Sequence, residues 1–214
     1  LIDSQTNILN THSMDYDLHL KKKESKSLFN SEYVVFIDQW GPFHPDHKIC
    51  SVPFPCSSEE YYDNLNVIFS LIEDKFGYKV IIAAHPKSHY QEMPDLFMNR
   101  EIVCGETYDL VKNSKFVLTS QSSAVHFAVI LKKPIIFLSL NSNRVNEFDL
   151  QVECFASKFG KSPIHLDGKY SLDFDTELKI DKKKYLELFE KYIKTPGSPE
   201  GYSWDIFADY LESL

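Results

Sequence analysis

The sequence predicts an α/β protein built on a doubly wound, mostly parallel, Rossmann-like sheet with helices on both faces. Short runs of apolar residues, rich in Val, Ile and Phe, recur along the chain and are typical of strands buried on both sides. Segments with the apolar spacing of helices separate these runs, and strands that alternate with helices form parallel sheets. The expected strands are residues 33–37, 79–83, 102–103, 116–119 and 135–138.

The composition is that of one large domain. The chain has 214 residues, 43% of them hydrophobic, and a formal net charge of -8, which argues against a nucleic-acid backbone as the main partner. No apolar run is long enough for a membrane span, and no signal peptide is visible. Because the sequence starts at Leu1 and not at Met, the lack of a visible signal peptide is weak evidence. Cysteines 50, 56, 104 and 154 lack zinc-type spacing, so we expect reduced thiols in a cytoplasmic protein, with a Cys50–Cys56 bridge as the alternative.

Three regions are expected along the chain. Residues 1–29 are polar and end in a charged stretch, which indicates a linker or the end of a preceding domain; a nucleic-acid-binding patch is the alternative. Residues 30–195 hold the expected sheet domain. Residues 196–214 begin with a Pro/Gly/Ser turn and continue as an aromatic-rich amphipathic helix, expected to pack back on the domain.

The first strand ends in a polar and aromatic loop, residues 38–47, of sequence DQWGPFHPDH. Asp38 at the strand end either faces the ligand cleft, where it would be a catalytic group, or caps the turn. His44, Asp46 and His47 have metal-binding side chains, but no further ligand follows nearby, and we predict no metal site.

The second strand follows a helix expected over residues 58–76. Ser58 with the two glutamates after it marks the start of that helix, and Gly77 marks its end. Further helices are expected over 93–99, 108–113 after a Thr107 cap, 150–159 and 182–193.

Residues 116–138 form the most informative stretch of the chain. A short strand leads into the serine-rich turn 120–123, then an apolar helix over 124–131, a lysine pair, a proline and another strand. Such a turn has free N–H groups and hydroxyls and is a good anion site. The alternative is that Ser122 or Ser123 only caps the helix.

Three loops should meet at the carboxyl edge of the sheet, namely 38–47, 84–89 and 119–123. The side chains that they bring together suit a phosphate or nucleotide, with positive charge from His85 and Lys87. Motifs of dinucleotide enzymes, P-loop ATPases and α/β-hydrolases are absent from the sequence. A serine hydrolase with His85 as base remains an alternative. The expected set is Asp38, His44, His85, Lys87, Ser120, Ser122 and Ser123.

Two segments of this region resemble a known family. IIAAHPK (81–87) and LTSQSSAVHFAVILKKPIIFLS (118–139) resemble the C-terminal, nucleotide-binding half of GT-B glycosyltransferases, and the bacterial sialyltransferases and Kdo transferases of surface-polysaccharide synthesis in particular. CDP-glycerol glycerophosphotransferases carry a segment similar to the second one. DQWGPFHPD (38–46) resembles uncharacterised surface-carbohydrate biosynthesis proteins. The resemblance covers roughly residues 32–140.

The resemblance implies a nucleotide-sugar donor, linked either to CMP or to a nucleoside diphosphate, a glycan acceptor and no cofactor. It implies that His85 contacts the donor and that Ser122 and Ser123 hydrogen-bond its phosphate, with Pro86, Lys87 and Ser120 beside them. Glu106 would meet ribose hydroxyls or remain a solvated loop carboxylate. We take His85 and Asp38 as the candidate catalytic residues.

The chain departs from the family in two respects. Nothing in it matches the acidic catalytic motif that the sialyltransferases carry in an N-terminal domain, and only one of the two GT-B domains fits in this length. The acceptor base is therefore unassigned. Phosphoglycerol transfer from CDP-glycerol and a non-catalytic nucleotide-sugar-binding or partner-binding domain are the alternative functions.

Overall fold

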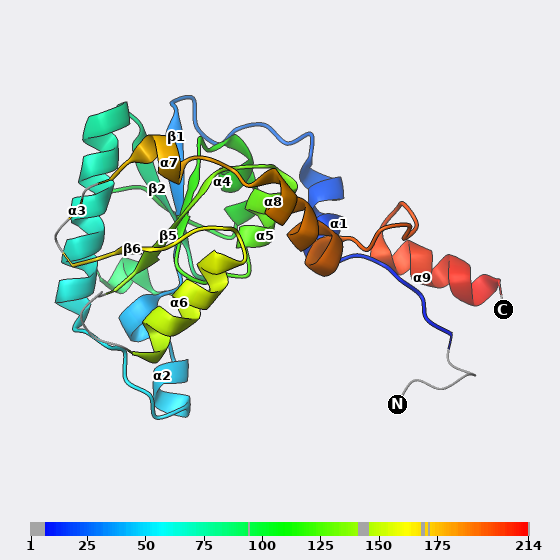
Figure 1. The fold of residues 1–214 in the computed structure, drawn as a ribbon, viewed down its shortest axis with the longest axis horizontal. Helices are drawn as coiled ribbons and strands as arrows, with labels where there is room; N and C mark the ends of the chain where they lie inside the picture. The colour runs from blue at the N-terminus through cyan, green and yellow to red at the C-terminus, as the bar shows by residue number, and fades with distance from the viewer. Residues whose placement is uncertain (1–6, 94, 141–145, 168–169, 171, 214) are drawn as a thin grey trace.

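A six-stranded, all-parallel sheet forms the centre of the protein (Figure 1). The computed structural model describes residues 7–93, 95–140, 146–167, 170 and 172–213. The sheet has the strand order β3-β2-β1-β4-β5-β6, and every neighbouring pair is parallel. This confirms the predicted fold class. The strands are β1 (Tyr33–Ile37), β2 (Lys79–Ala84), β3 (Ile102–Cys104), β4 (Val117–Thr119), β5 (Ile135–Ser139) and β6 (Ile164–His165).

The strand order reverses between β1 and β4. From β1 the chain adds β2 and then β3 on one side, and it returns to add β4, β5 and β6 on the other. Val35 of β1 is accordingly paired with Ile81 of β2 and with Val117 of β4. In open parallel sheets the loops that leave such a point diverge to opposite faces, and the crevice between their carboxyl ends binds ligands.

Helices cover both faces of the sheet, as predicted (Figure 1). Alternate residues of each strand point to opposite faces, so Val34 and Phe36 belong to one core and Val35 and Ile37 to the other. The long helix α3 packs on the first core, and α4, α5 and α6 pack on the second. The α-helices are α1 (Met14–Lys22), α2 (Asp46–Ile49), α3 (Ser58–Phe76), α4 (Thr107–Asn113), α5 (Val125–Ile130), α6 (Glu147–Ser157), α7 (Phe174–Glu177), α8 (Lys182–Leu188) and α9 (Ser203–Glu212).

Helix α3 has the predicted bounds, but a different residue caps it. The hydroxyl oxygen of Ser57, not Ser58, accepts a hydrogen bond from the Glu60 amide at 3.1 Å. Ser57 and Glu60 have the spacing of a capping box. Because Ser57 and Ser58 are adjacent, the sequence did not show which of them is the cap. At the other end Gly77 has a φ of 68°, the left-handed conformation that ends many helices.

Several shorter elements differ from the prediction. Helix α4 starts after Glu106 with no side-chain cap, so Thr107 is not its cap. Helix α5 begins at Val125, one residue later than expected, and α6 begins at Glu147. The segment 182–193 divides into α8 and a π-helical turn, Phe189–Ile193, and the described residues of 93–99 form turns, not a helix. Two further single turns of 3-10 helix are Gly41–Phe43 and Tyr90–Glu92.

The segment expected to be a linker contains helix α1, which packs on α4 and α5. Lys22 donates to Asp109 at 2.5 Å and to Glu106 at 2.7 Å, and Asp15 pairs with His126 at 2.9 Å. Lys22 of the charged stretch and Asp15 of α1 are therefore paired with the sheet domain.

Helix α9 packs on the domain only through its first turn. The Ser203 amide donates to Asp17 at 2.9 Å and Ile206 is buried, while the rest of the helix extends away from the sheet (Figure 1). No helix in the described ranges is both long and apolar enough to cross a bilayer.

Candidate functional site

A cleft of about 480 Å³ opens at the carboxyl edge of the sheet, where the strand order reverses. The loops that follow β1, β2 and β4 all contribute to it, and the start of α6 closes one side. The structure thus brings His85 together with Ser122 and Ser123, from two segments that are far apart in the sequence. The lining residues are Gln39, Gly41, His44, Asp46, His47, Phe54, His85, Gln121, Ser122, Ser123, Phe148 and Gln151.

His85 reaches the cleft from the end of β2 and is fixed by two hydrogen bonds. Its amide donates to Asp38 at 3.3 Å, and its ring Nδ1 accepts from the Lys87 amide at 3.2 Å. Because Nδ1 is the acceptor, the proton of the neutral ring lies on Nε2, which is a donor. Burial, and then the neighbouring His44 and Lys87, lower the pKa of His85. His85 is therefore a neutral hydrogen-bond donor at pH 7, and not the cation that the sequence suggested.

Asp38 lies beneath the cleft and does not line it. Its side chain is buried, and it accepts hydrogen bonds from the Trp40 amide at 3.0 Å, the Tyr90 hydroxyl at 2.6 Å and the His85 amide. Burial raises the pKa of Asp38, while these donors favour the carboxylate and oppose the rise. The carboxylate links the loop after β1 to the loop after β2. Asp38 therefore positions these loops and does not itself contact a ligand in the cleft.

The serines of the turn 120–123 divide into three environments. Ser120 is buried and is not part of the lining. Ser122 lines the cleft, and its hydroxyl oxygen accepts from the Ala124 amide at 3.3 Å, which is a local turn bond. Ser123 lines the cleft, is exposed, and its hydroxyl makes no hydrogen bond within the described part of the chain. Helix α5 has only six residues, so its dipole adds less than the sequence suggested.

The remaining predicted residues lie outside the cleft. Pro86 and Lys87 are exposed beside it, although the charge of Lys87 acts on His85. Glu106 pairs with Lys22 at 2.7 Å, away from the lining residues. His126, on α5, pairs with Asp15 and is half-buried.

The loop after β1 brings the expected His44 to the cleft, together with Asp46 and His47, which the predicted site set left out. His44 meets His85 edge to face with ring centroids 5.0 Å apart, and its Nδ1 lies 3.5 Å from the Asp46 carboxylate. The Nε2 atom of His47 lies 3.0 Å from the carbonyl oxygen of Gly41, and its Nδ1 atom lies 3.1 Å from the carbonyl oxygen of Val52. These contacts stabilise the conformation of the loop. The high content of aromatic and polar residues in 38–47 is the sequence feature that could have indicated that these residues line the site.

Two contacts join the walls of the cleft. The Gln39 side-chain oxygen accepts from the Gln121 amide at 3.0 Å, which links the loops after β1 and β4 directly. Phe54 and Phe148 pack edge to face with centroids 5.3 Å apart. Phe148 follows β5. The sequence around it does not indicate that it lines the cleft, because only the tertiary fold brings it to this edge.

Metal binding gains no support from the geometry. Among the residues that the structure describes, no three His, Cys, Asp or Glu side chains are grouped so as to hold a metal ion.

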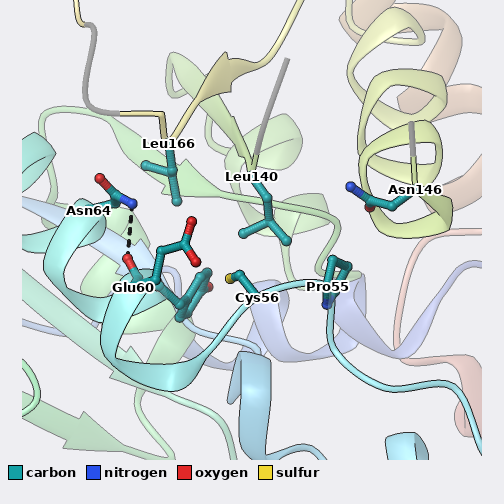
Figure 2. A pocket seen from close by; sticks show the side chains of 8 residues that line it. Pro55, Cys56, Glu60, Asn64, Leu140, Asn146 and Leu166 are labelled. Atoms are coloured by element: carbon teal, nitrogen blue, oxygen red, sulfur yellow. Dashed lines mark hydrogen bonds between the residues drawn. The ribbon is translucent and has the colours of Figure 1, made fainter. Parts of the chain in front are cut away.

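A second, much smaller cavity of about 40 Å³ lies between the start of α3 and the strands β5 and β6 (Figure 2). Figure 2 shows the Glu60 carboxylate and Cys56 at its centre, below Leu140 and Leu166. This volume suits one or two water molecules and not a nucleotide. Burial, together with the Glu60 and Asp149 carboxylates, raises the pKa of the Cys56 thiol to about 11, so it is not a thiolate nucleophile at neutral pH.

Known proteins resemble this chain only in fold. No family model matches it, and no curated protein matches it in sequence. The solved structures that are similar include E. coli heptosyltransferase WaaC with ADP-2-deoxy-2-fluoro heptose, glycosyltransferase SnogD from Streptomyces nogalater, and UDP-GlcNAc 2-epimerase from Methanocaldococcus jannaschii in complex with UDP-GlcNAc and UDP.

All three likenesses are remote. The identities are 12%, 9% and 16%, with TM-scores of 0.38, 0.46 and 0.48 in the same order. The matches cover 59%, 86% and 100% of this chain but only 38%, 44% and 56% of the matched chains, so this chain spans about half of their length or less. Likenesses of this strength carry no conclusion about activity. The proteins that resemble the chain include glycosyltransferases and a nucleotide-sugar epimerase.

Proposed function

We propose that this chain is the nucleotide-sugar-binding domain of a glycosyltransferase of surface-polysaccharide biosynthesis. The observation that carries the proposal is the cleft at the strand-order reversal, where the Nε2–H of His85 and the hydroxyl of Ser123 face the same space. Its volume of about 480 Å³ is within the range of small-molecule sites.

The cleft chemistry fits a departing phosphate. In glycosyl transfer the acceptor oxygen bonds to the anomeric carbon, the bond from that carbon to the phosphate oxygen breaks, and the nucleotide leaves with the electron pair. Fixed donors that face the leaving oxygens stabilise that charge. Among the residues that the structure describes, no Lys or Arg side chain lines the cleft, so the donors there include the neutral His85 ring and the serine hydroxyls.

A cytidine nucleotide is the first donor to test, because the paired segments 81–87 and 118–139 resemble enzymes that use CMP-linked sugars. Transfer of phosphoglycerol from CDP-glycerol would use the same cleft, with the His44 and Asp46 pair available to take the acceptor proton. The burial of Asp38 favours a non-catalytic nucleotide-sugar-binding domain instead, because it takes away the one carboxylate that the sequence assigned to catalysis.

Calorimetric titration of CMP, UMP and AMP tests the proposal. We expect CMP to bind most tightly, and His85→Ala to weaken binding by about ten- to a hundredfold, the loss of about 1.5–3 kcal/mol for a hydrogen bond to a charged group. His89→Ala is the matched control, since His89 lies on the same loop, is exposed and does not line the cleft. Equal affinities for the three nucleotides would remove the cytidine assignment, and no binding at millimolar ligand would overturn the proposal.

A further inference from the structure

Two turns with the same sequence pattern bring neighbouring histidine rings to the cleft. The sequence HPD (44–46) lies in the loop after β1, and the sequence HPK (85–87) lies in the loop after β2. In each turn the amide of the third residue donates a hydrogen bond to Nδ1 of the histidine, at 3.3 Å from Asp46 and at 3.2 Å from Lys87. The repeated sequence pattern therefore has a structural counterpart, because each of the two loops holds a histidine ring in the same way.

These two hydrogen bonds determine which nitrogen carries the proton of each neutral ring. A backbone amide can only donate, so Nδ1 is the acceptor in both rings and the proton lies on Nε2. Both rings line the cleft, and neither Nε2 atom has a hydrogen-bond partner within the part of the chain that the structure describes. His44 therefore has the same unused Nε2–H donor as His85.

The two rings are close enough to hold one group of a ligand. They meet edge to face with their centroids 5.0 Å apart. The His44 side chain is only 20% exposed, and the backbone of His85 is bound to the Asp38 carboxylate, so both rings are restrained before a ligand arrives. A phosphoryl group has several strong acceptor oxygens, and two donors on adjacent rings can bind two of them.

The other rings that line the cleft lack such a donor. Each ring nitrogen of His47 lies within 3.1 Å of a carbonyl oxygen of its own loop, so this ring is already engaged. Phe54 and Phe148 carry no polar atom in their side chains. Among the described residues that line the cleft, the ring N–H groups left for a phosphoryl group are therefore those of His44 and His85.

We infer that His44 is a second phosphate-binding residue, and that the Nε2–H groups of His44 and His85 donate to oxygens of the same phosphoryl group. The inference rests on the proposed function, because it takes a nucleotide as the ligand of the cleft. It gives Asp46 a positioning role, since the Asp46 amide holds the His44 ring in the donor tautomer.

The same geometry argues against His44 as the base that takes the acceptor proton. A base needs an unprotonated Nε2, and the proton of the neutral ring would then lie on Nδ1, directed at the Asp46 carboxylate 3.5 Å away. In that tautomer the Asp46 amide loses its acceptor. The two roles of His44 therefore require different tautomers, and an experiment can distinguish them.

Calorimetric titration of CMP into asparagine variants tests the inference. An asparagine side-chain oxygen accepts from the amide two residues later, so His44→Asn and His85→Asn retain the turn bond and lose the outer donor. We expect each variant to keep its melting temperature and to bind CMP about ten- to a hundredfold more weakly. His89→Ala is the matched control, because His89 is exposed, lies on the loop after β2 and does not line the cleft.

The double variant shows whether both rings bind the same phosphoryl group. Donors that share one group of the ligand are coupled, so the double variant should lose less affinity than the product of the two single losses. Heteronuclear NMR of the imidazole rings at about pH 8, where both are neutral, provides a readout that is independent of affinity. We expect the proton on Nε2 in both His44 and His85.

The outcomes separate a failure of this inference from a failure of the proposed function. The inference is overturned, and the proposed function stands, if the wild type binds CMP and His44→Asn binds it equally tightly. The same holds if the two single losses multiply in the double variant, or if the His44 proton lies on Nδ1. A wild-type chain that does not bind CMP at millimolar concentration overturns the proposed function, and this inference with it.

Discussion

Asp38 and His85 illustrate how a buried charge can place a ligand-facing ring. Removing the Asp38 carboxylate from water has a large free-energy cost, and three donors from the two loops after β1 and β2 offset it. One of these donors is the His85 amide, so the position of the His85 ring depends on a carboxylate that the ligand does not contact. The sequence predicted that Asp38 ends its strand at the ligand edge, but not the direction in which its side chain points.

The first prediction concerns this carboxylate. Asp38→Ala leaves the Trp40 amide, the His85 amide and the Tyr90 hydroxyl without their acceptor, each at a cost of about 1–3 kcal/mol if it stays buried. We expect a loss of several kcal/mol in the free energy of unfolding, measured by urea denaturation. Tyr90→Phe removes a single donor and should cost about 1 kcal/mol. Equal, small losses in both variants would show that Asp38 does not hold the loops together.

Ser122 and Ser123 allow a second prediction at the same scale, because their hydroxyls differ in what they already bind. Ser123→Ala should weaken nucleotide binding and leave the melting temperature unchanged, since its hydroxyl has no hydrogen bond within the described residues. Ser122→Ala should lower stability by about 1 kcal/mol, because it removes a local turn bond. Calorimetric titration and thermal unfolding on the same preparations measure both effects. If Ser123→Ala is less stable than the wild type but binds nucleotide normally, Ser123 has a structural role and not a ligand-binding one.

A third prediction follows from the lowered pKa of His85. The folded protein binds this proton less tightly than the unfolded chain does, so the stability that the neutral ring contributes is present above about pH 6.5, the ordinary value for histidine. It is lost as the pH falls through the lower pKa of the folded state. When the pH is lowered through this range, we expect the free energy of unfolding to fall less in His85→Asn than in the wild type. Comparison with the wild type cancels the opposite contribution of Asp38, whose raised pKa stabilises the fold as the pH falls. Parallel pH profiles for the two proteins would contradict the assignment.

At the scale of the elements, predictability followed the strength of the local pattern. Five strands and α3 were predicted because buried runs and helical spacing are periodic over several residues. Strand β6 has only two residues and pairs through Leu138 and Ser139 of β5, so no periodicity could reveal it. Helix α1 has no buried residue, and its polar surface is typical of a linker. It is held by Tyr16 and Leu18 against the second core and by ion pairs with Asp109 and His126, and a local pattern contains none of these partners.

The attachment of α1 gives the fourth prediction. The Asp109 side chain is 5% exposed and accepts from Lys22 and Ser25, whereas the Glu106 side chain, which pairs with the same lysine, is 43% exposed. Asp109→Ala should therefore lower the free energy of unfolding by about 3 kcal/mol, and Glu106→Ala by less than about 1 kcal/mol. Urea denaturation of both variants measures the difference. Equal effects would mean that solvent screens both pairs alike.

At the scale of the whole molecule, the sheet order decides which loops meet. The sequence predicted three loops at one edge because the carboxyl ends of parallel strands share it. It could not predict that β1 and β4 would be neighbours, that Gln39 would bond across to the Gln121 amide, or that Phe148 would complete a wall. Those features depend on strand order and on contacts between residues more than 80 positions apart.

The last prediction asks whether nucleotide binds in the cleft or in the groove of about 710 Å³ between α1, α5 and α8. The cleft is lined by histidines, glutamines and serines at the carboxyl edge of the sheet, while the groove is mostly apolar, so we expect phosphate to bind in the cleft. With saturating CMP, hydrogen–deuterium exchange should slow in the loops after β1, β2 and β4, where bound ligand stabilises the closed backbone. The peptides of α8 and of the turn after it should exchange unchanged. His85→Ala should abolish the protection in all three loops together, because they form one site. Protection confined to the groove, or to the loop after β4 alone, would show that the three loops do not act as a single nucleotide site.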